Sequence, residues 1–196
     1  MNASSLPVLM HHYISRHANS IAVSPEFFEA QCKALAKAGW RGIGLAEAEA
    51  YFLHGEPVPA KSCLITFDDG YLDNYVHAWP ILEKYGHKGV VFAVAERMEE
   101  GEARPTLKDV WSGSVDTAAL PHVDNPFLKQ PGGYTVRSDT FMNWNEAKRM
   151  EASGVMAIAS HTFAHRGVPV SGDYTDFFLP GNRPRTFDRP EPFFWV

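Results

Sequence analysis

The sequence predicts a single α/β domain in which parallel strands alternate with helices, as in a partial or distorted (β/α) barrel. Short, continuously apolar segments recur along the chain, several end in polar residues, and segments with helix-capping signals lie between them. Strands that alternate with helices pair in parallel, because a parallel connection needs a crossover element. The chain has 196 residues, of which 45% are hydrophobic, so one domain over residues 1–196 is expected.

A buried first strand is expected at residues 6–14, an apolar run that ends in polar residues. Ser24 then supplies an N-cap, and Pro25 suits the first position of the helix that follows. Gly39 ends this helix, and a short strand is expected at residues 41–45. The chain therefore begins with a strand, a helix and a second strand.

The next segments continue the alternation. A helix is expected at residues 47–53, followed by the clearest strand, residues 62–67, which is continuously apolar as in a sheet covered on both faces. Residues 74–85 predict one helix with Pro80 straining its middle, and residues 89–95 predict another buried strand.

The second half is less regular. Residues 96–143 show no sustained period and are expected to be a long loop that acts as a lid, or an ordered insertion. Asn143 caps a helix predicted at residues 144–153, and a final strand is expected at residues 155–159. Residues 177–196 form an irregular tail rich in aromatic residues and proline.

Composition excludes several classes of protein. The 18 Lys and Arg residues against 23 Asp and Glu give a net charge of −5 without a basic run, so nucleic acid is not an expected partner. No segment approaches the ~20 apolar residues of a membrane span, and the first residues do not have the pattern of a signal peptide. Cys32 and Cys63 are expected to be buried free thiols.

Residues capable of chemistry follow two of the predicted strands. Asp68 and Asp69 come after residues 62–67, and His161 and His165 follow the last strand. Side chains just past the carboxyl ends of parallel strands face a common crevice, and two imidazoles with one carboxylate can bind a divalent metal ion. Each motif alone is weak evidence, because Asp-Asp-Gly also suits a turn and the chain has nine histidines. Together they favour a metal site.

The two motifs resemble a known family. Residues 66–71 (TFDDGY) and 160–165 (SHTFAH) are similar to the first two signatures of the NodB-type polysaccharide deacetylases, carbohydrate esterase family four. Residues 7–14 (PVLMHHYI) resemble the first-strand segment of the branch that acts on poly-N-acetylglucosamine and related exopolysaccharides. The resemblance extends over residues 6–165, and it implies a barrel of the NodB type.

The resemblance implies a reaction and a site. It makes the protein a hydrolase that removes acetyl groups from an N-acetylated polysaccharide or oligosaccharide. Asp68 would be the catalytic base, and a divalent ion, zinc before cobalt, nickel or iron, would be bound by the family's ligand set. The residues expected at or near the site are Asp68 as base, Asp69, His161 and His165 as metal ligands, and His12, Tyr71 and Trp111 near the substrate.

Part of the family pattern has no clear counterpart. The family's third signature contains arginine and proline, and Arg183-Pro184-Arg185 is similar to it only superficially. The later tryptophan and histidine signatures, whose histidine acts as an acid, are not found. We therefore expect a C-terminally truncated domain. The family resemblance suggests a periplasmic or extracellular location.

Two other functions remain open. The aromatic tail needs a partner surface, which favours a homo-oligomer and a non-catalytic metal-containing module that binds carbohydrate or takes part in assembly. The third hypothesis is an amidohydrolase for a small acylated substrate in the cytoplasm. Activity on a small amide but not on sugar oligomers would select this last function.

Overall fold

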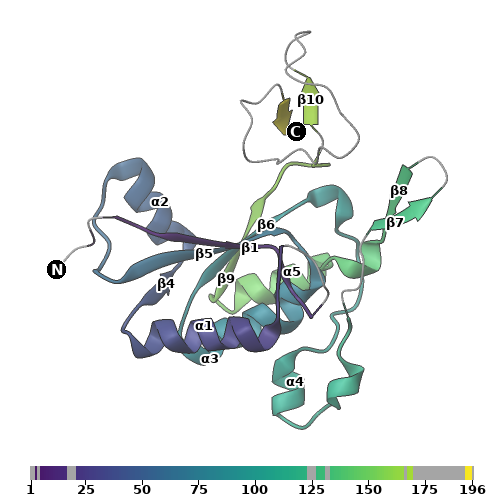
Figure 1. Cartoon of the computed structure of the whole chain (residues 1–196), viewed down its shortest axis with the longest axis horizontal. Coiled ribbons are helices and arrows are strands. Elements are labelled where there is room, and N and C mark those ends of the chain that lie inside the picture. The colour runs from purple at the N-terminus through teal and green to yellow at the C-terminus, as the bar shows by residue number, and fades with distance from the viewer. Residues whose placement is uncertain are drawn as a thin grey trace, which may run out of the picture.

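The computed structural model describes residues 3, 5–16, 21–122, 127–130, 133–165, 167–169 and 193–195. At its centre is a five-stranded parallel sheet (Figure 1). The strands are β1 (Val8–His11), β4 (Arg41–Ile43), β5 (Ser62–Asp69), β6 (Gly89–Ala93) and β9 (Met156–Ser160).

The order β1-β5-β6-β9 places β5 near the middle of the sheet, and β4 pairs with the first residues of β5. All of these pairings are parallel. The predicted α/β class with a parallel sheet is confirmed. In the described residues β1 and β9 occupy the two ends of the sheet order and do not pair with each other, so this part of the chain is an open sheet.

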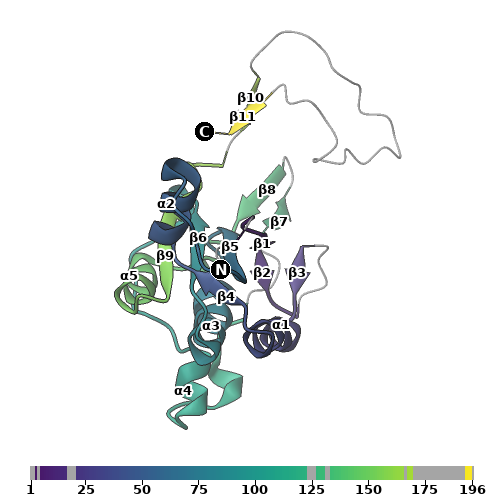
Figure 2. The same cartoon turned by 90° about the vertical axis from the view of Figure 1, so that its left-hand side faces the viewer.

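Helices cover both faces of the sheet (Figure 2). The helices α1 (Pro25–Lys37), α3 (Trp79–Tyr85) and α5 (Trp144–Ala152) pack on one face, and α2 (Leu45–His54) lies on the other. The α1 helix begins as predicted, because the Ser24 hydroxyl accepts a hydrogen bond from the backbone N–H of Phe27 at 3.2 Å.

Alternate residues of a strand point to opposite faces of the sheet, and those of β5 pack into two different apolar clusters. Cys63, Ile65 and Phe67 of β5 belong to the large apolar cluster that includes α1, α3 and α5. Leu64 and, in β6, Val90 belong to a smaller cluster with residues of β4 and α2. A sheet that buries both faces needs apolar residues at every position, which is why these strands are continuously apolar in the sequence.

The prediction for the first strand is wrong in two respects. The strand is broken at His12, and Val8, Leu9 and Met10 of β1 are exposed instead of buried. After β1 the chain bends, and β2 (Tyr13–Ile14) pairs with β3 (Ala22–Val23) and not with β5. The side-chain amide of Asn74 donates to the His12 carbonyl oxygen at 2.9 Å and holds the bend. A contact with a residue so distant in the chain leaves no sign in the local apolar pattern.

The predicted helix over residues 74–85 is present as one continuous helical segment, but its first part is not α-helical. The structure has a π-helical turn, η1 (Asn74–Ala78), followed by α3, and Pro80 lies in the first turn of α3. Proline has no N–H to donate to the preceding turn, and its ring would clash there. A change of helix type just before Pro80 avoids both penalties.

Residues 96–143 contain several short elements. These are α4 (Leu107–Trp111), η3 (Thr117–Ala119), η4 (Ser138–Thr140) and an antiparallel hairpin of β7 (Phe127–Gln130) and β8 (Gly133–Val136), preceded by η2 (Ala95–Arg97).

In the predicted tail, β11 (Phe193–Trp195) pairs antiparallel with β10 (Gly167–Pro169). The other residues of 177–196, including Arg183, Pro184 and Arg185, lie outside the described residues. Cys32 and Cys63 are buried free thiols, as predicted. No helix in the described part of the chain has the length and apolar character needed to span a membrane.

Candidate metal centre

Two strand ends bring the predicted ligands together. Asp69 is the last residue of β5, and His161 directly follows β9. Both strands are parallel to β6, so their carboxyl ends lie at the same edge of the sheet. One ligand atom from each of Asp69, His161 and His165 lies within 4.8 Å of the others. The structure therefore brings the three residues into one cluster.

The Asp69 carboxylate is the centre of this cluster. Its Oδ1 atom lies 3.8 Å from His161 Nε2 and 3.5 Å from His165 Nε2. Asp69 is buried, and Oδ1 has no hydrogen-bond partner among the described residues. A buried carboxylate oxygen without a donor is unfavourable unless a cation occupies the space before it.

The loop that carries the two histidines is fixed by backbone hydrogen bonds. The N–H of His161 donates to the Ala93 carbonyl at 2.9 Å, and the N–H of His165 donates to Thr162 Oγ1 at 2.9 Å. Thr162 and His165 have φ angles of 65° and 52°, and Asp69 has 74°, in the left-handed region that non-glycine residues seldom adopt. Such backbone strain is concentrated at functional sites.

Gly70 completes the sharp turn after Asp69. Its φ is +79°, and a Cβ at this position would lie 3.0 Å from the Cβ of Ala93 in β6. A glycine is therefore required both by the backbone conformation and by the close approach of β6. The Asp-Asp-Gly sequence thus forms a turn and also contributes Asp69 to the cluster.

Asp68 and His12 lie beside the cluster. His12 Nε2 is 3.9 Å from Asp68 Oδ2, and both side chains are about one-fifth exposed, at 20% and 17%. Burial raises the pKa of Asp68 above its ordinary value, and the neighbouring histidines His12, His161 and His165 oppose this rise. A carboxylate with a raised pKa is a stronger base near neutral pH.

The imidazoles are suited to metal binding. Burial lowers the pKa of His165, and the nearby Asp69 carboxylate acts in the opposite direction. A lowered pKa keeps the imidazole neutral at pH 7, and only the neutral form can donate a lone pair to a metal. One carboxylate and two imidazoles match the donor set of a catalytic zinc site and leave positions for water and substrate. The residues present therefore fit a divalent cation.

Tyr71 and Trp111 occupy different positions from the ligands. Tyr71 is buried and stacks between Tyr13 and Phe141, with ring centroids 3.8 Å and 5.0 Å away. Burial and the nearby Asp69 carboxylate both raise the pKa of Tyr71, so its hydroxyl is close to the cluster. Trp111 belongs to α4, where the Lys84 amine lies 4.7 Å from its ring, and the structure does not bring it to the metal cluster (Figure 1).

One residue near the cluster was not predicted from the sequence. Arg97 Nη1 lies 3.7 Å from Asp69 Oδ1. Arg97 ends the short helix η2, just beyond β6. The same rule that identified Asp69 and His161, a polar residue just past the end of a parallel strand, could have indicated it.

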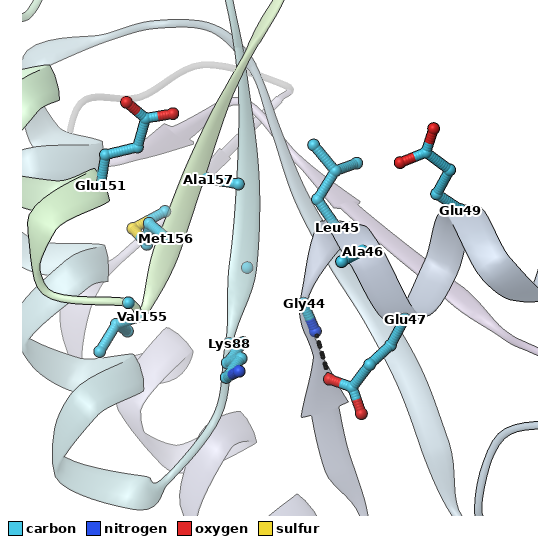
Figure 3. A pocket seen from close by; sticks show the side chains of 12 residues that line it. Gly44, Leu45, Ala46, Glu47, Glu49, Lys88, Glu151, Val155, Met156 and Ala157 are labelled. Atoms are coloured by element: carbon cyan, nitrogen blue, oxygen red, sulfur yellow. Dashed lines mark hydrogen bonds between the residues drawn. The ribbon is translucent and has the colours of Figure 1, made fainter.

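A cleft elsewhere in the molecule does not include these residues. It has a volume of about 370 Å³ and lies between the start of α2 and the amino ends of β6 and β9 (Figure 3). Gly44, Leu45, Lys88 and Met156 are among its lining residues, and the Gly44 N–H donates to the Glu47 carboxylate there at 3.1 Å. The cleft is thus at the edge of the sheet opposite to the ligands.

The chain matches known proteins over the part that contains the cluster. The family model for polysaccharide deacetylases matches residues 55–176. The chain is 41% identical over 93 residues to the polysaccharide-deacetylase-type protein YxkH of Bacillus subtilis (strain 168), which is 47% of this chain and 33% of that protein. It is 26% identical over 145 residues to the poly-beta-1,6-N-acetyl-D-glucosamine N-deacetylase of Escherichia coli (strain K12), which is 72% of this chain and 18% of that enzyme. The chain therefore spans about a third or less of the length of these two relatives.

Solved structures share the fold. IcaB from Ammonifex degensii superposes with a TM-score of 0.56 and 25% identity, over 82% of this chain and 54% of that one. A de-N-acetylase from Aggregatibacter actinomycetemcomitans superposes with a TM-score of 0.60 and 20% identity, over 85% of this chain and 58% of that one.

Proposed function

Because the chain belongs to the polysaccharide deacetylase family, we propose that it is a metal-dependent hydrolase that releases acetate from an N-acetylated polysaccharide. Asp69, His161 and His165 are the proposed metal ligands, and Asp68 is the proposed catalytic base. The observation that supports this function most strongly is the convergence of the three donors within 4.8 Å, with Asp68 directly before one of them.

The chemistry divides between the cation and the side chains. A bound divalent cation would polarise the amide carbonyl and lower the pKa of a water molecule toward ~7. Asp68 accepts the proton of the attacking water, and burial strengthens it as a base by raising its pKa. His12, at 3.9 Å from Asp68, helps to keep the carboxylate directed toward the site. Zinc suits the ligand set best, and cobalt, nickel and iron are also compatible with it.

The proposed substrate is a polymer of N-acetylglucosamine. One relative is named as an N-deacetylase of poly-beta-1,6-N-acetyl-D-glucosamine, and the region of similarity covers 72% of this chain. An exposed aromatic residue, Phe163, lies in the sequence between the two proposed histidine ligands. Aromatic faces pack well against the apolar faces of sugar rings, and this position adjoins the reacting centre.

The first test is release of acetate from N-acetylglucosamine oligomers by the metal-loaded protein. We expect chelation to abolish release and Asp68→Asn to reduce it by about 10²–10⁴-fold, because that change removes the base and leaves the ligands. Stoichiometric metal in the Asp68→Asn protein would show that the site persists. The matched control is Asp116→Asn. Asp116 is exposed, caps η3 and is not part of the cluster.

Other outcomes would select other functions. No acetate release by a protein that binds one equivalent of metal would contradict the deacetylase and favour a non-catalytic carbohydrate-binding module. Hydrolysis of a small acylated amide without any action on sugar oligomers would favour a small-molecule amidohydrolase. Metal binding that survives substitution of both His161 and His165 would show that the proposed ligands are wrong.

A further inference from the structure

Arg97 is built into the turn that supports the histidine loop. It is the last residue of η2, directly after β6. In that turn the N–H groups of Ala95 and Glu96 donate to the carbonyls of Thr162 and Phe163, at 3.4 Å and 2.8 Å. The segment that carries Arg97 and the segment that carries His161 and His165 are therefore joined by backbone hydrogen bonds.

The Arg97 guanidinium is held between an aromatic ring and a carboxylate. Its Cζ lies 5.1 Å from the centre of the Phe141 ring, and its Nη1 lies 3.7 Å from Asp69 Oδ1. The side chain is only 13% exposed. A largely buried cation needs a carboxylate partner, and the flat guanidinium is suited to stacking on a ring while it faces that partner.

Phe141 is itself fixed. It is buried, stacks on Tyr71 at 5.0 Å and forms an isolated β-bridge with that residue. The backbone N–H of the next residue, Met142, donates to the Gly70 carbonyl at 3.1 Å. The Phe141 ring against which Arg97 packs is thus linked by hydrogen bonds to the Asp-Asp-Gly turn, which also carries Asp69.

Arg97 and the two histidines approach the same carboxylate oxygen. Asp69 Oδ1 lies 3.7 Å from Arg97, 3.8 Å from His161 and 3.5 Å from His165. A cation between the carboxylate and the imidazoles would share Asp69 with the guanidinium. Residues that contact a metal ligand without binding the metal themselves fix the orientation of that ligand and strongly influence metal affinity.

We propose that Arg97 is a positioning residue of the metal centre, which holds the Asp69 carboxylate turned toward His161 and His165 and thereby raises the affinity of the site for a divalent cation. This inference rests on the proposed function, because it takes these three residues as the ligands. A second effect of Arg97 has the opposite sign, since its positive charge repels the bound cation. The negative charge of Asp69 lies within 4 Å of the guanidinium and of both imidazoles, and offsets part of this repulsion, so we take the orienting effect as the larger one.

The test compares metal affinity in the wild-type chain, Arg97→Met, Arg97→Lys and a control, Arg41→Met. Methionine retains the apolar bulk over Phe141 without the charge, and lysine retains the charge without the planar fork. Arg41 is exposed and pairs with Glu47 in a different part of the sheet. Competition with a chromophoric chelator gives the dissociation constants for Zn²⁺ and Co²⁺, and the visible spectrum of bound Co²⁺ reports the ligand geometry.

We expect Arg97→Met to weaken metal binding by about 10–100-fold and to change the Co²⁺ spectrum. Arg97→Lys should lie between it and the wild type, and Arg41→Met should match the wild type. Unchanged or tighter binding by Arg97→Met would overturn the inference. Should that variant fail to fold without metal, a wild-type affinity and spectrum in Arg97→Lys would overturn it equally.

The same titrations separate this inference from the proposed function. A wild-type chain that binds neither ion, or binds them as well after His161→Ala, would show that the proposed metal site is wrong, and the role of Arg97 with it. Binding that needs His161 but is indifferent to Arg97 would leave the metal site intact and overturn only the positioning role.

Discussion

Asp73 is a buried carboxyl group at the start of η1, shortly after Asp69 in the chain. It is 1% exposed, its Oδ1 accepts a hydrogen bond from the Asn74 amide at 3.0 Å, and its Oδ2 has no partner within the described part of the chain. Burial raises its pKa from 3.8 to about 8, against the effect of the Ile14 and Asn74 backbone N–H groups. Asn74 also holds the His12 carbonyl, so this pair supports the bend that places His12 beside Asp68.

The raised pKa predicts how stability depends on pH. The folded chain binds the Asp73 proton more tightly than the unfolded chain, so this group favours folding most below pH 3.8, and its contribution falls as the pH rises toward about 8. We expect Asp73→Asn to be more stable than the wild type above pH 8 and to show a flatter profile between about pH 4 and 8. Urea unfolding of both proteins across this range measures the difference. Parallel profiles would show that Asp73 does not titrate as stated.

At the scale of elements, one ion pair joins the irregular segment before α5 to the helix itself. Arg104 donates to both carboxylate oxygens of Glu146 at 2.8 Å, and also to the carbonyls of Asp139 and Phe141. Glu146 is fully buried and accepts from the Asn143 N–H at the start of α5. This carboxylate therefore fixes the segment that brings Phe141 under Arg97.

Glu146→Ala should be strongly destabilising. The change leaves a partly buried arginine and a helix end without their acceptor, which costs roughly 3–5 kcal/mol for a buried pair. Glu47 is the matched control, because it forms the same kind of cap and arginine pair at α2 but is much more exposed. Glu47→Ala should cost about 1 kcal/mol or less. Denaturant unfolding measures the free energy of unfolding of both variants. An equal decrease in the two would show that burial of Glu146 does not make its contacts more stabilising than those of Glu47.

At the scale of the whole molecule, a metal ion would join the two halves of the fold. Asp69 lies at the end of β5 and His161 follows β9, so an ion bound to both connects elements far apart in the chain. Binding to the folded chain alone raises its stability, by about 2.7 kcal/mol when the free ion is at 100 times its dissociation constant.

We therefore expect added zinc to raise the melting temperature and a chelator to lower it again. His161→Ala should have a melting temperature that responds little to zinc, because one of the three proposed ligands is gone. Differential scanning calorimetry with and without chelator is the measurement. A zinc response of the same size in His161→Ala would indicate that the ion binds elsewhere.

The sequence was sufficient to predict the parallel sheet and the clustering of Asp69, His161 and His165, because both depend on local rules. Continuous apolar runs mark strands buried on both faces, and strand ends in a parallel sheet share one edge. The bend at His12 and the role of Arg97 could not be predicted in this way. Each depends on a partner that only the folded chain provides, Asn74 in one case and Asp69 with Phe141 in the other.

The left-handed backbone conformation of Asp69, Thr162 and His165 affects which residues can replace them during evolution. Glycine or asparagine is accommodated more easily in that conformation than a β-branched residue such as threonine. In a lineage that no longer used the site, selection for stability alone would favour glycine or asparagine at these three positions, whereas selection for metal binding would retain Asp69 and His165. The pattern of substitution at these positions among natural sequences distinguishes the two histories without any purified protein.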